Sequence, residues 1–144
     1  METASTTVEF LVIDDDPRVT RFLTADLQSK QHSSASLTDG DSILAWLHLN
    51  HCEVVIVDVN IPKLDGISLI SSIRNTDRNL PIIVFTGLGY DEEQMHAALR
   101  AGANGYVSKN LPVDQLYAVL SQVLLTTRRH TLRDDRRTTL LGAA

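Results

Sequence analysis

Polar side chains suited to phosphate chemistry follow four of the short apolar runs in this sequence. The first run is followed by the acidic triplet Asp14–Asp16, and a later run by Asp58. Thr86 follows the next run, and Lys109 comes just after the last one. If these runs are strands of one parallel sheet, their carboxyl ends lie at the same edge, where ligands of such sheets usually bind. The side chains would then meet there.

The chemistry of such a cluster follows from the residue types. Clustered carboxylates repel one another unless a cation joins them. Oxygen ligands select a hard ion, and Mg²⁺ is the usual one in phosphate chemistry. A lysine adds positive charge for an anionic group, and a threonine adds a hydrogen-bond donor. The set therefore indicates phosphoryl transfer with a carboxylate nucleophile, a metal ion and charge neutralisation.

The elements that must position these residues can be predicted from hydrophobic periodicity. Short apolar runs predict strands over residues 8–13, 33–37, 54–57, 82–85 and 105–107. Amphipathic stretches predict helices over residues 17–30, 41–49, 66–74, 91–101 and 112–127. Asp16 before Pro17 is typical of a helix start, and Gly102 of a helix end. Strands that are apolar throughout and alternate with helices predict an α/β fold, with a doubly wound parallel sheet of five strands and five helices.

Length and composition suit one domain in a reducing compartment. The chain has 144 residues and a single cysteine, Cys52, which excludes an internal disulfide and favours the cytoplasm. No apolar run reaches the roughly 20 residues that span a bilayer, and the start of the chain lacks the features of a signal peptide, so we expect no membrane association. We expect residues 1–6 to form a disordered arm and residues 128–144 a basic tail or linker.

The charge is unevenly distributed along the chain. Residues 1–127 contain 16 acidic and 8 basic residues, whereas residues 128–144 contain five arginines and two aspartates. Binding to nucleic acid needs a basic face, so the acidic body argues against direct contact with nucleic acid. The basic tail is either solvated or able to contact an acidic partner.

Four segments together resemble the receiver domain of two-component response regulators, the CheY-like family. They are residues 11–15 (LVIDD), 57–66 (VDVNIPKLDG), 84–87 (VFTG) and 102–109 (GANGYVSK). The resemblance covers about residues 7–127. It implies a flavodoxin-like sheet with the strand order 2-1-3-4-5, and a signalling switch rather than a turnover enzyme.

The resemblance also implies a phosphoacceptor and a metal site. Asp58 would accept a phosphoryl group from the phosphohistidine of a sensor histidine kinase or a histidine phosphotransfer protein. Asp15 and Asp58 would bind Mg²⁺ through their carboxylates, and Asn60 through its backbone carbonyl. Asp14 would act on the same ion through water.

Further positions would sense the phosphoryl group. Lys109 would pair with the carboxylate or the phosphoryl oxygens, and Thr86 and the Gly87 N–H would hydrogen-bond to a phosphoryl oxygen. Tyr106 resembles the aromatic switch residue that moves inward with the threonine. The face made by the fourth helix, fifth strand and fifth helix would then engage an effector protein or output domain, and a homodimer formed on phosphorylation is a further implication.

Four details depart from the family pattern or need their own interpretation. Asn110 stands where the family has proline, which predicts a trans bond after Lys109, because a cis bond before a non-proline residue costs about 2.5–4 kcal/mol. In the family, the residue two positions after the threonine tunes how water reaches the phosphoryl group. Leu88 stands there and cannot orient water, which predicts slow self-dephosphorylation. Gly87 replaces the more common alanine or serine and allows more backbone freedom. Asp16 is interpreted as a helix cap rather than a metal ligand.

Other interpretations use the same residues. A receiver-like interaction module that is never phosphorylated is the main alternative. A haloacid-dehalogenase-type phosphatase would need a threonine at position 18, where this chain has Arg18. A dinucleotide site would need a third glycine at position 92, where this chain has Glu92. His48, His51 and Cys52 have a weak metal-ligand spacing, but a structural zinc site needs four ligands.

Overall fold

The computed structural model describes residues 5–39, 41–60, 65–87 and 91–142. Its strands are β1 (Thr7–Ile13), β2 (Ser34–Leu37), β3 (His51–Val57), β4 (Ile82–Thr86) and β5 (Gly105–Ser108). Its helices are α1 (Pro17–Ser29), α2 (Ile43–Leu49), α3 (Gly66–Thr76), α4 (Glu92–Ala101) and α5 (Val113–Gly142). The strands form one parallel sheet in the order β2-β1-β3-β4-β5, which confirms the predicted doubly wound α/β fold.

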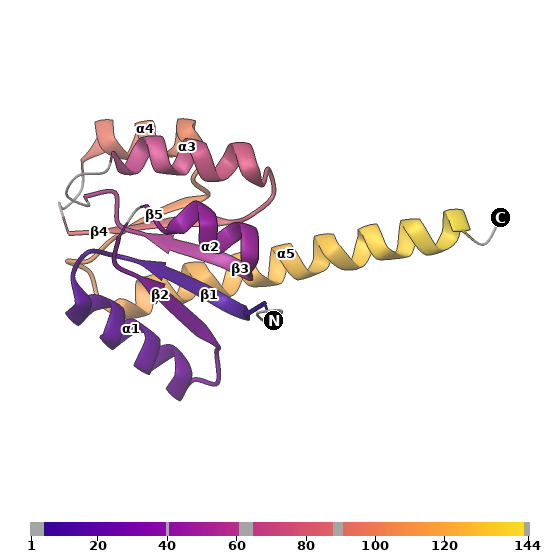
Figure 1. The fold of residues 1–144 in the computed structure, drawn as a ribbon, viewed down its shortest axis with the longest axis horizontal. Helices are drawn as coiled ribbons and strands as arrows, with labels where there is room; N and C mark the ends of the chain where they lie inside the picture. The colour runs from indigo at the N-terminus through magenta and orange to yellow at the C-terminus, as the bar shows by residue number, and fades with distance from the viewer. Residues whose placement is uncertain (1–4, 40, 61–64, 88–90, 143–144) are drawn as a thin grey trace.

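Helices cover both faces of the sheet (Figure 1), because side chains along each strand alternate between the two faces. On one face, strand residues pack against α2, α3 and α4, and the buried members include Leu11, Ile13, Val55, Val57, Val84, Ile43, Ile70, Ile73 and Ala98. On the other face, strand residues pack against α1 and α5, and the buried members include Phe10, Val12, Ile56, Ile83, Leu23, Leu27, Leu116 and Leu120. The central strands are therefore apolar throughout, as their sequences indicated.

Aspartate caps begin three of the helices that leave the carboxyl edge of the sheet. The Asp16 carboxylate accepts a hydrogen bond from the Arg18 N–H at the start of α1. Asp65 does the same for α3, and Asp91 for α4. Each cap satisfies backbone donors that a helix start leaves free. The caps thus fix where these helices begin after their strands.

The last helix differs from the prediction. Its predicted end at Thr127 is wrong, since α5 continues to Gly142 and its last part projects away from the body (Figure 1). The apolar face does end near Leu124, the last buried residue of α5 that the structure describes. Arg128, however, still reaches the sheet through Glu9 at 3.1 Å and Glu53 at 3.2 Å. No glycine or proline interrupts the following residues, so helix propensity extends the helix beyond its packed face.

Other differences from the predicted elements are small. The strand β3 begins at His51 rather than at residue 54, because Thr7 and Val8 of β1 pair with His51 and Cys52. The predicted trans bond after Lys109 is confirmed, since there is no cis peptide bond within the described residues. Among the helices of the described ranges, none is long and apolar enough to cross a membrane.

One glycine is required by close packing beside the polar edge of the sheet. A Cβ atom on Gly66 would lie 2.4 Å from the Val59 Cα and 2.5 Å from the Val59 carbonyl oxygen. Gly87 differs, because a Cβ atom there would lie 3.7 Å from the nearest atom, Cδ of Lys109. We therefore predict that Gly66→Ala lowers the free energy of unfolding by about 2–3 kcal/mol, as overpacking does.

The matched control is Gly87→Ala, which we expect to change the free energy of unfolding by under about 1 kcal/mol. Both variants can be compared with the wild type by urea denaturation. Equal losses of stability in the two variants would contradict the packing argument.

Candidate functional site

The sheet brings the sequence-predicted residues together at its carboxyl edge. Ile13 of β1 pairs with Val57 of β3, so the residues that follow, Asp14 and Asp58, stand side by side. The Asp58 N–H donates to the Ile13 carbonyl at 2.9 Å. At the other end of the edge, the N–H of Lys109 donates to the Thr86 carbonyl at 2.8 Å. Residues that are far apart in the sequence are thus placed by backbone pairing alone.

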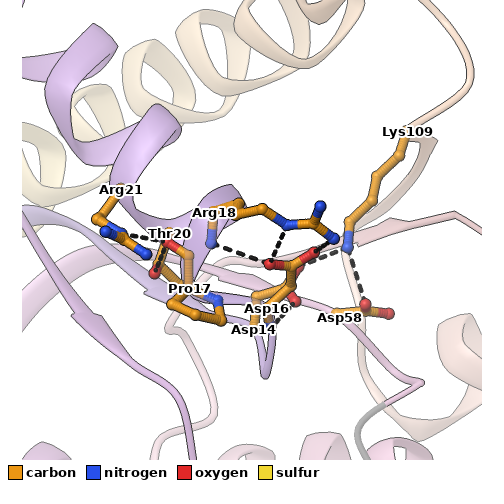
Figure 2. A network of polar contacts seen from close by, with 8 residues as sticks. All are labelled: Asp14, Asp16, Pro17, Arg18, Thr20, Arg21, Asp58 and Lys109. Carbon is orange, nitrogen blue, oxygen red and sulfur yellow. Dashed lines mark hydrogen bonds and ion pairs between the residues drawn. The ribbon is translucent and has the colours of Figure 1, made fainter.

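The Lys109 ammonium group joins two of the carboxylates (Figure 2). Its Nζ lies 2.5 Å from Asp14 Oδ2 and 2.9 Å from Asp58 Oδ2. Both carboxylates are buried, with only 2% of Asp14 and 6% of Asp58 exposed. Removing one partner of such a buried pair leaves an uncompensated charge, which is strongly destabilising. The ammonium group therefore allows two acidic side chains to remain next to each other inside the protein.

Burial and charge act in opposite directions on these groups. Burial raises the pKa of Asp14 above its ordinary value, although the hydrogen bond from Lys109 opposes that change. For Lys109, burial would lower the pKa, but the hydrogen bonds to Asp14 and Asp58 outweigh it and hold the pKa above its ordinary value. The lysine is therefore a permanent cation at neutral pH.

A third carboxylate, from exposed Asp15, completes an acidic cluster. Asp14, Asp15 and Asp58 each have an oxygen within 4.8 Å of one another. Among the described residues this is the only such group of potential metal-ligating side chains. Three carboxylate oxygens with no nitrogen or sulfur ligand fit a hard divalent cation.

Asp16 does not join this cluster. Its carboxylate accepts from the Arg18 backbone N–H at 2.9 Å and from the Arg18 Nε and Nη2 at 3.2 and 3.1 Å (Figure 2). These hydrogen bonds lower the pKa of Asp16. The predicted role of Asp16 as a helix cap is confirmed, and the acidic triplet supplies two residues to the cluster rather than three.

The second oxygen of Asp58 is held by the loop that follows it. The Asn60 N–H donates to Asp58 Oδ1 at 2.9 Å, so each oxygen of this carboxylate has a donor. The carboxylate is thereby fixed in orientation. Asn60 thus enters the site through its N–H, and metal binding by its carbonyl stays a prediction.

Thr86 differs from its polar neighbours because its hydroxyl has no partner among the residues that the structure describes. The residue is fully buried, and its Oγ1 makes no hydrogen bond within the described part of the chain. A buried polar group without a partner costs free energy, and native proteins rarely keep one without a reason. Gly87, next along the chain, is exposed and lies against the Lys109 side chain.

Tyr106 lies on the same side of the sheet but outside the acidic cluster. It pairs with Val84 in the register of β4 and β5, and its hydroxyl donates to Gln94 Oε1 of α4 at 3.0 Å. Burial raises the pKa of Tyr106, and the charges of Asp91 and Asp58 add to this. The hydroxyl therefore remains a hydrogen-bond donor at neutral pH.

The sequence-based analysis missed three residues that shape the site or its surroundings. Gly66 lies in the segment 57–66 that resembles the family, and Arg128 begins the basic tail, but the sequence assigned no contact to them or to Gln94, since each acts through a contact that only the fold creates. Leu88 and the motif residues 61–64 lie outside the described residues, so slow self-dephosphorylation stays a prediction.

The weak histidine and cysteine pattern lies at the opposite edge of the sheet. His48 is in the last turn of α2, and His51 and Cys52 begin β3. Burial raises the pKa of the Cys52 thiol to about 12, so it stays protonated and is a poor metal ligand. These three residues do not form a metal-ligating group with one another or with other described residues.

Comparisons with known proteins agree with this geometry. The family model for the response regulator receiver domain matches residues 10–121. The transcriptional regulatory protein PrrA of Mycobacterium tuberculosis is 30% identical over 142 residues, which cover 99% of this chain and 60% of that protein. The Francisella response regulator 1452 receiver domain has a TM-score of 0.76 at 27% identity, covering 83% of this chain and 98% of that one. The chain belongs to the response regulator receiver family of two-component systems.

Two further points follow from these comparisons. A CheY-like receiver domain from Methanospirillum hungatei has a TM-score of 0.79 at 18% identity, covering 88% of this chain and 99% of that one, and supports the fold. The family model that matches describes a receiver domain, which favours the receiver interpretation over the phosphatase and dinucleotide interpretations. The chain spans about 60% of the length of the PrrA relative.

The unpartnered hydroxyl of Thr86 leads to a prediction about stability. Thr86→Val removes this hydroxyl and keeps the shape of the side chain, so the free energy of unfolding should stay the same or rise by about 1 kcal/mol. Thr20→Val is the matched control, because Thr20 is also buried but its hydroxyl donates to the Pro17 carbonyl at 3.1 Å.

The control variant should lose about 1 kcal/mol, since it gives up a made hydrogen bond. Urea denaturation of both variants in the absence of phosphodonor measures the difference. A Thr86→Val variant that loses as much stability as Thr20→Val would show that the hydroxyl is satisfied in the resting protein.

Proposed function

We propose that this protein is a phosphoryl-accepting switch in which Asp58 receives a phosphoryl group from a sensor histidine kinase or a histidine phosphotransfer protein. The observation that carries the proposal is the environment of Asp58. The carboxylate is nearly buried, is held by the Asn60 N–H and is paired with Lys109 at 2.9 Å. It also lies beside two other carboxylates that suit a divalent cation.

The transfer is a displacement at phosphorus. A carboxylate oxygen of Asp58 forms a bond to phosphorus as the bond from phosphorus to the donor's histidine nitrogen breaks, and the electron pair leaves with the imidazole. Lys109 lies within hydrogen-bond distance of the Asp58 oxygen, so its charge can stabilise the phosphoryl oxygens. Mg²⁺, held by Asp15, Asp58 and the Asn60 carbonyl with Asp14 acting through water, would neutralise further negative charge there.

The phosphorylated state is detected by residues beside the acceptor. The Thr86 hydroxyl and the Gly87 N–H would hydrogen-bond to phosphoryl oxygens, and Tyr106 would move with Thr86. The face made by α4, β5 and α5 would then contact an effector protein or an output domain, or pair with a second copy. Such a change is a local charge event that shifts a two-state equilibrium.

The proposed switch also has an expected compartment, mode of action and output. We infer a cytoplasmic protein that acts by stoichiometric modification, not by turnover of a substrate, and that does not bind nucleic acid directly through this domain. The relative PrrA is described as a transcriptional regulatory protein. A transcriptional output for this protein would have to come from a partner or an attached domain.

A phosphorylation assay tests the acceptor directly. On incubation with acetyl phosphate and Mg²⁺, the intact mass of the wild type should rise by one phosphoryl group, and that of Asp58→Asn should not change. Asp16→Asn is the matched control, because Asp16 lies in the same acidic triplet but is bound to Arg18.

The control variant should be labelled as fully as the wild type. Labelling of Asp58→Asn to the wild-type level would contradict the assignment. A wild type that neither this donor nor a histidine kinase labels would favour an interaction module that works without phosphorylation.

A further inference from the structure

A side-chain hydrogen bond joins Tyr106 to the first turn of α4. The Tyr106 hydroxyl donates to Gln94 Oε1 at 3.0 Å, and both residues are partly buried. The Tyr106 ring also packs on the apolar cluster between the sheet and the helices α3 and α4. The orientation of the ring therefore depends on one polar contact in addition to packing.

Gln94 is itself held in place. The Asp91 carboxylate accepts hydrogen bonds from the Glu93 N–H at 3.0 Å and from the Gln94 N–H at 3.2 Å. The Asp91 carbonyl accepts from the Met95 N–H at 2.9 Å. The first turn of α4 is thus capped, and it presents the Gln94 amide from a fixed backbone.

Tyr106 and Thr86 occupy the same face of the sheet. Val84 pairs with Tyr106, and Thr86 pairs with Ser108 two residues further on. Because side chains alternate along a strand, residues two apart point to the same side, and Thr86 and Tyr106 are diagonal neighbours across β4 and β5. In this resting arrangement the tyrosine hydroxyl has a partner, whereas the threonine hydroxyl has none among the described residues.

We propose that Gln94 is a positioning residue that holds Tyr106 against α4 in the unphosphorylated protein and so sets how readily the switch responds. The proposal rests on the proposed function, since it assumes that Tyr106 moves when the acceptor is occupied. Leaving the resting state breaks the hydrogen bond to Gln94. Without it, the active arrangement becomes easier to reach, so any ligand that favours that arrangement binds more tightly.

Linkage gives the expected size of the effect. A neutral hydrogen bond is worth about 1 kcal/mol net, which corresponds to roughly fivefold in an equilibrium constant. If the resting state holds nearly all molecules, removing the bond should strengthen the binding of a phosphoryl mimic by up to about fivefold. The change should disappear when Tyr106 lacks its hydroxyl.

The test is a double-mutant cycle on the binding of beryllofluoride in the presence of Mg²⁺. Binding is measured by titration, with NMR signals of Thr86 and of the residue at position 106 as the readout. Gln94→Met keeps the length of the side chain but removes the acceptor oxygen. We expect this variant to bind beryllofluoride about threefold to fivefold more tightly than the wild type does. Gln94→Glu keeps an acceptor oxygen and should not bind more tightly. In a Tyr106→Phe background, Gln94→Met should have no further effect.

The outcomes separate this inference from the proposed function. If the wild type does not bind beryllofluoride with Mg²⁺, the proposed function fails, and the role of Gln94 fails with it. If the wild type binds but Gln94→Met has unchanged affinity, the inference about Gln94 is wrong and the switch stands. Equal tightening by Gln94→Met in the wild-type and Tyr106→Phe backgrounds would also overturn it, because the effect would then not pass through the hydroxyl.

Discussion

The contact on which the site depends is the pairing of one ammonium group with two buried carboxylates. Lys109 lies 2.5 Å from an oxygen of Asp14 and 2.9 Å from an oxygen of Asp58. Without that cation, two neighbouring acids in a buried position would repel each other and lose their solvation. The contact among these three residues also requires the observed fold. For them to meet, β1 and β3 must be adjacent, and β5 must end at the same edge of the sheet.

Much of this arrangement could be predicted from the sequence. The apolar runs indicated where the strands lie. The four polar residues at the ends of these runs, Asp14, Asp58, Thr86 and Lys109, were therefore expected at one edge of the sheet. The end of α5 was not predicted, because the apolar face ends near Leu124 while the helix continues to Gly142, and the contacts of Arg128 with Glu9 and Glu53 cannot be seen in the sequence. Contacts between side chains far apart in the sequence, such as that of Tyr106 with Gln94, leave no periodic pattern to detect.

In the proposed switch, the two residues that would sense the phosphoryl group, Thr86 and Tyr106, have different hydrogen bonding at rest. Thr86 is fully buried, and its hydroxyl has no partner in the described part of the chain, whereas Tyr106 has its hydroxyl hydrogen-bonded to α4. A phosphoryl oxygen near Thr86 would satisfy the first group, and a shift of the ring would release the second. In the proposed switch, the free-energy difference between the two states would then depend on a few individual hydrogen bonds, and a single modification could reverse a difference of that size.

If Asp58 forms the acyl phosphate, chemical trapping can locate the modified residue. Borohydride reduces an aspartyl phosphate to homoserine, so protein phosphorylated in the presence of Mg²⁺ can be reduced, digested and mapped by mass spectrometry. We expect homoserine at position 58 alone. Homoserine at position 14, 15 or 16 instead, with Asp58 unchanged, would contradict it.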